Sequence, residues 1–314
     1  MNRIAILGAG TMGPGIAQSL TATGAEIVMY DIDPQALSRA SDTLHGSLST
    51  SVEQGVLLPE DREQLFARVA YTQDLSAALE GAGLVIEAVV ERADVKQALY
   101  SQLDAMLPPE VVLASNTSFL DIFSLVPQRR LPRTVIAHWY APAHIIPLVE
   151  LCPNEQTLPC VLEELTALLK SCGKQPVVMK KFIQGYIVNR IQMCLNQEVF
   201  YLLDQGYCTA QDIDLALKSA FFPRAMVLGV MQKIDFGGLA MTANTFRNKS
   251  YRLPPAVDMP TSLAERLARG ETGVAAGKGF YDYTGKSPAE LCAKRDKQVM
   301  RAFRLQRELL DDPI

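Results

Sequence analysis

The feature that most constrains this chain is a glycine-rich turn that joins a short apolar segment to a helical one. Residues 3–7 are apolar, Gly8, Gly10 and Gly13 follow in the pattern G-x-G-x-x-G, and apolar residues then recur at helical spacing. A second apolar segment, residues 26–30, comes after that expected helix. A strand, a glycine turn, a helix and a second strand in this order predict a βαβ unit whose first turn binds a dinucleotide.

Each glycine of the turn has its own expected role in binding the dinucleotide. Gly8 permits the tight turn, Gly10 lets the backbone approach a pyrophosphate, and Gly13 lets the helix pack closely on the strand. Thr11 and Met12 lie in the same turn, just before the helix. The N-terminus of that helix offers N–H groups and a partial positive charge to the phosphates. The alternatives are an ordinary βαβ turn and the glycine loop of a methyltransferase.

An acidic residue at the end of the second expected strand indicates which dinucleotide binds. Asp31 would accept hydrogen bonds from the ribose hydroxyls of the adenosine. Its carboxylate would repel a 2′-phosphate, so we expect NAD rather than NADP. Arg39 is the nearby residue that could instead pair with such a phosphate.

Composition and charge narrow the class of protein. The chain has 314 residues, of which 48% are hydrophobic and 20% charged, as in a globular protein of one large or two medium domains. A net charge of -4 argues against a nucleic acid or an anionic membrane as partner. The six cysteines show no metal-ligand spacing, so we expect reduced thiols and no metal site. With a strand expected from residue 3, we expect no signal peptide and a cytoplasmic protein.

Apolar segments alternate with helical ones through roughly the first 180 residues. Strands are expected at residues 3–7, 26–30, 69–72, 84–89, 111–115, 134–138, 148–151 and 175–179, and helices at residues 34–45, 59–68 and 96–106. Strands that are almost continuously apolar predict a mostly parallel sheet covered on both faces, with late short strands running antiparallel at its edge. We therefore predict an α/β fold with a Rossmann-type, doubly wound sheet.

Strand patterns fade after residue 184 and helical ones replace them. Residues 187–203 are apolar around most of a helix and predict a central buried helix. Thr209 and Ser262, each followed three residues later by an acid, predict capping boxes, and Gly270 predicts a helix end. We predict an NAD-binding domain at residues 1–184 and a smaller all-α substrate and dimerisation domain at residues 185–314.

Polar side chains gather where the expected strands end, which is where doubly wound sheets bind ligands. Residues 115–118, with the sequence Ser-Asn-Thr-Ser, follow one strand, His138 ends another, and Glu150 lies in the strand after that. A turn with an N-cap explains two of the four polar residues without any ligand. Of the other two histidines, His45 is expected on the surface, and His144 lies in the same loop as His138, near substrate or on its rim.

A carboxylate beside an imidazole makes a general base. Glu150 bonded to Nδ1–H of His138 would fix the tautomer, aim Nε2 at a substrate and stabilise the charged ring. With a nicotinamide cofactor, this predicts oxidation of an alcohol: His138 takes the hydroxyl proton while the carbinol carbon gives up hydride. Ser118 would polarise the same oxygen. The alternative is a structural His–Glu pair.

These residues resemble the L-3-hydroxyacyl-CoA dehydrogenases and their smaller-substrate relatives, including L-gulonate dehydrogenase and lambda-crystallin. The likeness extends from residue 8 to residue 283, through Glu-Ala-Val-Val-Glu at 87–91, Ser-Asn-Thr-Ser at 115–118, His-Trp-Tyr-Ala-Pro at 138–142, Leu-Val-Glu at 148–150, Gly-Tyr-Ile-Val-Asn-Arg at 185–190 and Gly-Lys-Gly-Phe-Tyr-Asp-Tyr at 277–283.

The resemblance implies a role for individual residues. His138 falls on the catalytic histidine, Glu150 on its partner, Ser118 on a serine near the substrate oxygen and nicotinamide, and Asn189 on an asparagine that reaches the active site. The resemblance also implies that Ala88, Glu91 and Lys96 lie at the cofactor. It implies a homodimer formed through the helical domain, to which the apolar residues 221–239 would contribute unless they are core.

Two departures from the family pattern concern the substrate. Ala141 stands where the hydroxyacyl-CoA enzymes usually have asparagine, which removes a polar contact near substrate and nicotinamide. Those enzymes also hold the adenosine phosphates of CoA with basic residues after the second strand. Here no lysine precedes Lys96, and the arginines between the second and third expected strands are Arg39, Arg62 and Arg68.

The predicted function is NAD-dependent oxidation of a 3-hydroxyacyl substrate, such as 3-hydroxybutyryl-CoA, to the 3-oxo product, as in fatty acid metabolism. One alternative is a dehydrogenase of a small non-CoA hydroxy acid or ring alcohol, because the loop with His-Ile-Ile-Pro at 144–147 looks like that of relatives acting on compact substrates. The other is a catalytically silent, crystallin-like NAD-binding protein.

Overall fold

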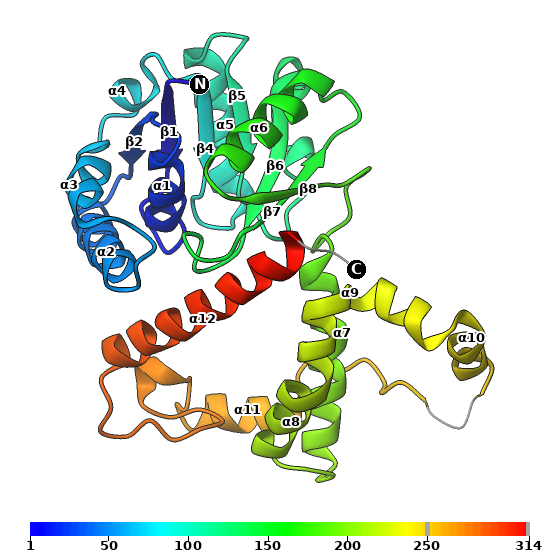
Figure 1. Ribbon diagram of the computed structural model, residues 1–314. Coiled ribbons are helices and arrows are strands. Elements are labelled where there is room, and N and C mark those ends of the chain that lie inside the picture. Colours follow the sequence, from blue (N-terminus) through cyan, green and yellow to red (C-terminus); the bar gives the residue numbers. More distant parts are fainter. Residues whose placement is uncertain (249–251, 312–314) are drawn as a thin grey trace. The chain divides into compact units, whose positions relative to one another are not determined.

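The chain divides into two compact units in the computed structural model, which describes residues 1–248 and 252–311 (Figure 1). The first unit comprises residues 1–186, and the second begins at residue 187. An eight-stranded sheet with helices forms the first unit and helices form the second, so the predicted fold class is confirmed.

The sheet has the strand order β3-β2-β1-β4-β5-β6-β7-β8. Its strands are β1 (Arg3–Leu7), β2 (Glu26–Tyr30), β3 (Val69–Thr72), β4 (Leu84–Glu87), β5 (Val112–Ser115), β6 (Thr134–Trp139), β7 (Leu148–Pro153) and β8 (Gln175–Val178). Neighbouring strands are parallel except for β6 and β7, which are antiparallel. The reversal arises because only a short loop joins β6 to β7, whereas parallel strands need a long crossover connection.

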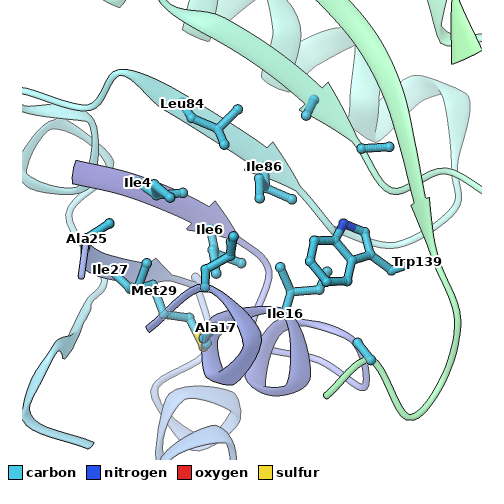
Figure 2. Packing of buried hydrophobic residues seen from close by; sticks show 14 of the residues in the cluster. Ile4, Ile6, Ile16, Ala17, Ala25, Ile27, Met29, Leu84, Ile86 and Trp139 are labelled. Atoms are coloured by element: carbon cyan, nitrogen blue, oxygen red, sulfur yellow. The ribbon is translucent and has the colours of Figure 1, made fainter. Parts of the chain in front are cut away.

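Helices cover both faces of this sheet. They are α1 (Gly13–Thr21), α2 (Pro34–Glu53), α3 (Pro59–Ala67), α4 (Leu75–Leu79), α5 (Ala93–Met106) and α6 (Pro159–Ser171), with short 3₁₀ turns at Ile122–Ser124 and Gln128–Arg133. Alternate residues of β1 point to opposite faces, so Ile4 and Ile6 pack with α1, α2 and α6, while Ala5 and Leu7 pack with α4 and α5. Figure 2 shows the first cluster, where Ile16 of α1 lies near Trp139 of β6.

Helix α2 is longer than the sequence pattern predicts. We expected it to end at residue 45, before Gly46, but it continues to residue 53. Leu44 and Leu48 lie one helical turn apart and are both buried in the core, so packing holds the helix together across the glycine. Tertiary contacts thus outweigh the roughly 1 kcal/mol that a glycine costs inside a helix.

The second unit contains helices and no strand among its described residues. They are α7 (Val188–Asp204), α8 (Ala210–Ala216), a π-helical segment (Leu217–Phe221), α9 (Phe222–Gly237), α10 (Leu239–Arg247), α11 (Thr261–Ala268), a 3₁₀ turn (Val274–Ala276) and α12 (Pro288–Asp311). The expectation of a buried α7 is wrong for this chain, because none of its residues is buried and its apolar Ile191 and Met193 are exposed.

One of the two predicted capping boxes forms. Thr209 and Asp212 cap α8 reciprocally, as predicted. The prediction of a capping box at Ser262 is wrong, because α11 begins at Thr261 and no side chain at the start of this helix caps it. The carboxylate of Asp204, at the end of α7, instead accepts hydrogen bonds from the backbone N–H groups of Thr261 and Ser262 at 2.8 and 2.9 Å.

A buried lysine holds the loop between β6 and β7. Lys174 is 6% exposed, and its ammonium donates to the backbone oxygens of Ala143 and Ile146 at 2.6 and 3.0 Å and lies 5.5 Å from the centre of the Trp139 ring. Burial lowers the pKa of Lys174 to about 8 from an ordinary 10.5. Lys174 therefore anchors this loop at the cost of a desolvated charge.

We expect Lys174 to make stability rise with pH. The folded protein releases this proton near pH 8, whereas the unfolded chain holds it to 10.5, so unfolding takes up a proton in that window. From pH 7 to 9 the unfolding free energy of wild type should rise by about 1 kcal/mol relative to Lys174→Met. Urea titrations of both proteins at the two pH values measure this, and a difference that stays constant would contradict it.

Candidate active site

The glycine turn after β1 has the close contacts that a dinucleotide turn needs. Gly8 has φ +112°, and a Cβ there would lie 2.5 Å from the backbone oxygen of Ala88, at the end of β4. A Cβ on Gly13 would lie 2.2 Å from the backbone oxygen of Gly8. A Cβ on Gly10 would meet nothing within 4 Å. The turn is therefore closed where it meets the protein and open at Gly10, where a pyrophosphate would approach.

The start of α1 is also suited to an anion. No side chain caps this helix, and its first turn contains no acidic residue. Asp31 lies beside the turn, where its Oδ2 accepts a hydrogen bond from the backbone N–H of Ala9 at 2.8 Å. Open backbone at Gly10, an uncapped helix N-terminus and an acid placed for the ribose fit NAD.

His138 and Glu150 face each other across the antiparallel pair of strands. They are register partners on β6 and β7, so their side chains lie directly opposite on one face of the sheet. Nδ1 of His138 is 3.2 Å from Oε2 of Glu150, and the side chains are 4% and 1% exposed. The contact through Nδ1 leaves Nε2 as the ring atom available to a substrate.

Two tyrosines surround the His138 ring. The ring of Tyr140 lies edge-on to it with centroids 4.5 Å apart, and the Tyr140 hydroxyl donates to Oε2 of Glu150 at 2.6 Å. The ring of Tyr186 lies 4.8 Å away on a tilt, and its hydroxyl donates to the backbone oxygen of Thr117 at 2.8 Å. Tyr186 has φ +52°, which is uncommon for a bulky residue, so contacts around it hold the backbone there.

In the polar segment 115–118, three side chains make hydrogen bonds to other residues that the structure describes and one does not. Ser115 donates to Glu87 at 2.6 Å, Asn116 accepts from the backbone N–H of Trp139 at 2.8 Å, and Thr117 donates to Glu91 at 2.6 Å. The Ser118 hydroxyl makes no hydrogen bond to another residue within the described chain. The Asn116 contact joins the end of β5 to β6, so the Ser118 segment and His138 come from neighbouring strand ends.

A charged cluster of Glu87, Glu91 and Lys96 supports the Ser118 segment. Oε1 of Glu91 accepts from the backbone N–H groups of Ser118 and Phe119 at 2.8 and 2.9 Å, while Oε2 pairs with Lys96 at 3.2 Å. Lys96 also pairs with Glu87 at 2.5 Å. Burial alone would raise the pKa of Glu91, but the hydrogen bonds from Thr117 and the backbone, with the Lys96 charge, bring it below its ordinary value.

Two members of this cluster, Glu91 and Lys96, are residues that the family resemblance places at the cofactor. The Lys96 side chain is 1% exposed and Glu91 33%, so the ammonium lies inside the wall of the site and the Glu91 carboxylate reaches its surface. Both roles stay predictions, as does that of Asn189, which lies in the first turn of α7 in the second unit. Thr11 is exposed and Met12 packs partly against the core.

Sequence reasoning missed several residues of this site. Glu87 is a fully buried acid at the end of an otherwise apolar strand, and that contrast was the available signal. Tyr186 and Lys174 gave no comparable signal, because each acts through a partner distant in sequence. Tyr140 shares its partner Glu150 with His138, but nothing in its residue type marked it. Within the described residues no group of three or more His, Cys, Asp or Glu could hold a metal, and no helix is long and apolar enough to cross a bilayer.

Comparison with known proteins places this architecture in a family. Residues 3–182 match the model of the 3-hydroxyacyl-CoA dehydrogenase NAD-binding domain, and residues 185–283 match that of the 3-hydroxyacyl-CoA dehydrogenase C-terminal domain. The chain belongs to the 3-hydroxyacyl-CoA dehydrogenase family. It is an NAD-dependent oxidoreductase of the type that acts on CH–OH groups, as the resemblance implied.

The similar proteins differ in their substrates. The chain is 30% identical over 306 residues to 5-formyl-3-hydroxy-2-methylpyridine 4-carboxylate 5-dehydrogenase of Mesorhizobium japonicum, covering 97% of this chain and 98% of that protein. A crystal structure of an enzyme of that name, described as an NAD⁺-dependent dismutase, matches with a TM-score of 0.88 and 30% identity over 98% of this chain and 99% of the other. The 3-hydroxyadipyl-CoA dehydrogenase of Escherichia coli is 34% identical over 91% of this chain and 60% of its own length.

Proposed function

We propose that the protein oxidises the CH–OH group of a compact hydroxylated substrate with His138 as the general base. The observation that carries this proposal is the buried His138–Glu150 pair at the carboxyl end of β6, at the same edge of the sheet as the glycine turn after β1. NAD, when bound, supplies the acceptor for the hydride that leaves the carbinol carbon.

In this proposal, different residues transfer the proton, stabilise the charged imidazole and bind the substrate oxygen. Nε2 of His138 takes the hydroxyl proton, and Glu150 on the Nδ1 side stabilises the charged ring. Ser118, whose hydroxyl is not engaged within the described chain, donates to the substrate oxygen. Glu91 and the Asn116 contact hold the Ser118 segment in place. The role that the family resemblance implies for Asn189 stays a prediction.

A small substrate without CoA is favoured by the surface after β2. The three arginines there already have partners: Arg39 pairs with Asp33 at 3.2 Å, Arg62 with Glu63 at 2.9 Å, and Arg68 donates to the Gly24 carbonyl at 2.5 Å. No lysine lies in that stretch to hold the phosphates of CoA. One relative, matched over 98% of its length, is named for a small pyridine carboxylate, although others matched over nearly all of their length are named for 3-hydroxybutyryl-CoA.

Oxidation of a 3-hydroxyacyl-CoA is the second candidate. The family and the E. coli relative carry that activity in their names. The Arg39–Asp33 pair is exposed, and such pairs contribute at most about 1 kcal/mol, so phosphates could displace the acid. This outcome would connect the protein with fatty acid metabolism.

A substrate panel decides between these candidates. Purified protein is mixed with NADH and either acetoacetyl-CoA or free 3-oxo acids, and with NAD⁺ and free hydroxy acids or ring alcohols, while absorbance of NADH is followed. We expect turnover with the free compounds and at least tenfold lower kcat/KM with the CoA thioester. The reverse order would favour the second candidate. NADH binding without turnover on any compound would favour a silent NAD-binding protein.

We also propose a cytoplasmic homodimer formed through the helical unit. Met231, Phe236 and Leu239, in the apolar segment 221–239, are 75%, 64% and 66% exposed. Several large apolar side chains exposed on one segment are typical of an interaction surface and not of a core. All six cysteines are free, as expected of a reducing compartment. Light scattering coupled to gel filtration should give twice the chain mass of 34.4 kDa. A monomer at micromolar concentration would contradict the dimer.

A further inference from the structure

A second donor shares the carboxylate oxygen that holds the proposed base. Oε2 of Glu150 accepts from the Tyr140 hydroxyl at 2.6 Å and lies 3.2 Å from Nδ1 of His138. We propose that Tyr140 is a positioning residue that sets how strongly Glu150 stabilises the protonated His138 ring. The proposal rests on the proposed function, in which His138 must be neutral to accept a proton.

The backbone brings the three side chains together. His138 and Tyr140 are two residues apart at the end of β6, so both can face Glu150 on the antiparallel strand β7. The edge-on packing of the two rings, 70° between planes, keeps the Tyr140 hydroxyl over the carboxylate and not over solvent. Glu150 is 1% exposed, so protein groups, and not bulk water, balance its charge.

Because Oε2 of Glu150 also accepts from Tyr140, it stabilises the protonated imidazole of His138 less strongly. A hydrogen bond to an ionised carboxylate is short and strong, and each added donor stabilises the charge and lowers its pull on other donors. The phenol makes the shorter of the two contacts. The phenol therefore weakens the pull of Glu150 on the Nδ1–H of His138, while Glu150 still orients the ring.

Most other titratable groups near the pair do not change charge at working pH. Burial raises the pKa of the Cys152 thiol on β7 to about 12 and also raises the pKa of Tyr186. Hydrogen bonds keep the pKa of Glu91 low, so this group stays charged. Asp121 is a further carboxylate that acts electrostatically on Cys152.

Two further groups lie close enough to need controls. Lys174 is behind Trp139, and burial lowers its pKa to about 8, so it affects only the alkaline side of a pH profile. His144 is in the loop that follows β6. The acidic side of the profile therefore reports on His138 with Glu150, provided that His144→Gln leaves it unmoved.

The test replaces Tyr140 by phenylalanine, which keeps the ring and removes the hydroxyl. We expect the acidic limb of the pH profile of kcat for alcohol oxidation to move to higher pH by on the order of half a unit or more, a threefold or greater loss of rate on that limb. The alkaline plateau should change less. Tyr71→Phe, which removes a phenol on β3 far from the site, is the matched control and should leave the profile unchanged.

A double-mutant cycle separates this role from a structural one. In a Glu150→Gln background the shared oxygen carries no charge, so Tyr140→Phe should no longer move the limb. An equal movement in both backgrounds would overturn the proposal. A variant with lowered thermal stability and an unmoved limb would overturn it as well, because that pattern marks a merely structural tyrosine.

A second readout does not depend on turnover. The chain has only three histidines, so the ring resonances of His138 can be assigned by NMR with His45→Gln and His144→Gln. Tyr140→Phe should move the midpoint of the His138 titration to higher pH, as in the kinetics. If no substrate is oxidised, the proposed function fails, while this titration still decides the role of Tyr140: an unmoved midpoint overturns it.

Discussion

Replacing His138 by alanine is expected to lower kcat by about two to four orders of magnitude, the usual contribution of a general base. The affinity for NADH should change little, because His138 lies at the end of β6 whereas the glycine turn and Asp31 follow β1 and β2. Steady-state kinetics and fluorescence titration with NADH measure the two effects. Unchanged turnover in a folded His138→Ala protein would remove His138 as the base.

Two other histidine variants make the result specific. His45 is exposed on α2, where it contacts Arg62 and Phe66, so His45→Ala should keep full activity. His144→Gln tests whether the second ring of the loop contributes, and we expect a much smaller loss of kcat than with His138→Ala. A loss as large as that of His138→Ala would assign the proton transfer to the loop and not to the strand.

The parts of the fold that could be predicted are those with a local pattern. The glycine spacing predicts a tight turn at Gly8 and close packing at Gly13, and the structure has a φ of +112° at Gly8 and no room for a Cβ at Gly13. Apolar runs predict the strands, and the short connection between β6 and β7 brings His138 opposite Glu150. A buried carboxylate next to a histidine can therefore be inferred from the sequence when both lie in adjacent strands.

The parts that could not be predicted depend on contacts distant in sequence. The acid that caps α11 is Asp204, 57 residues before Thr261, and a local search finds only Ser262. In the polar segment after β5, sequence alone does not show that Ser115 and Thr117 bond to buried or half-buried acids while Ser118 has no such bond. Residue type identifies candidates, and only the three-dimensional partners separate those available to substrate from those that hold the site together.

Replacing Lys96 by methionine is expected to destabilise the first unit by about 3–5 kcal/mol, the range for removing one member of a buried ion pair. The Glu87 carboxylate would keep its bonds to Tyr100 and Ser115 but lose the cation 2.5 Å away, and it is wholly buried. Urea unfolding followed by tryptophan fluorescence measures this, because the single tryptophan of the chain, Trp139, lies in β6 and reports on this unit.

The compensating variant is Glu87→Gln combined with Lys96→Met. The oxygen of a neutral amide at residue 87 can still accept from Tyr100 and Ser115, but its NH2 group would face the Val89 N–H that Oε1 accepts. The double variant should therefore recover part of the lost stability. Lys96→Met should also loosen Glu91, which lies 3.2 Å from the ammonium and holds the backbone of Ser118, so kcat should fall while NADH affinity is kept. Unchanged stability with weakened NADH binding would instead show that Lys96 acts on the cofactor, as the family resemblance implies.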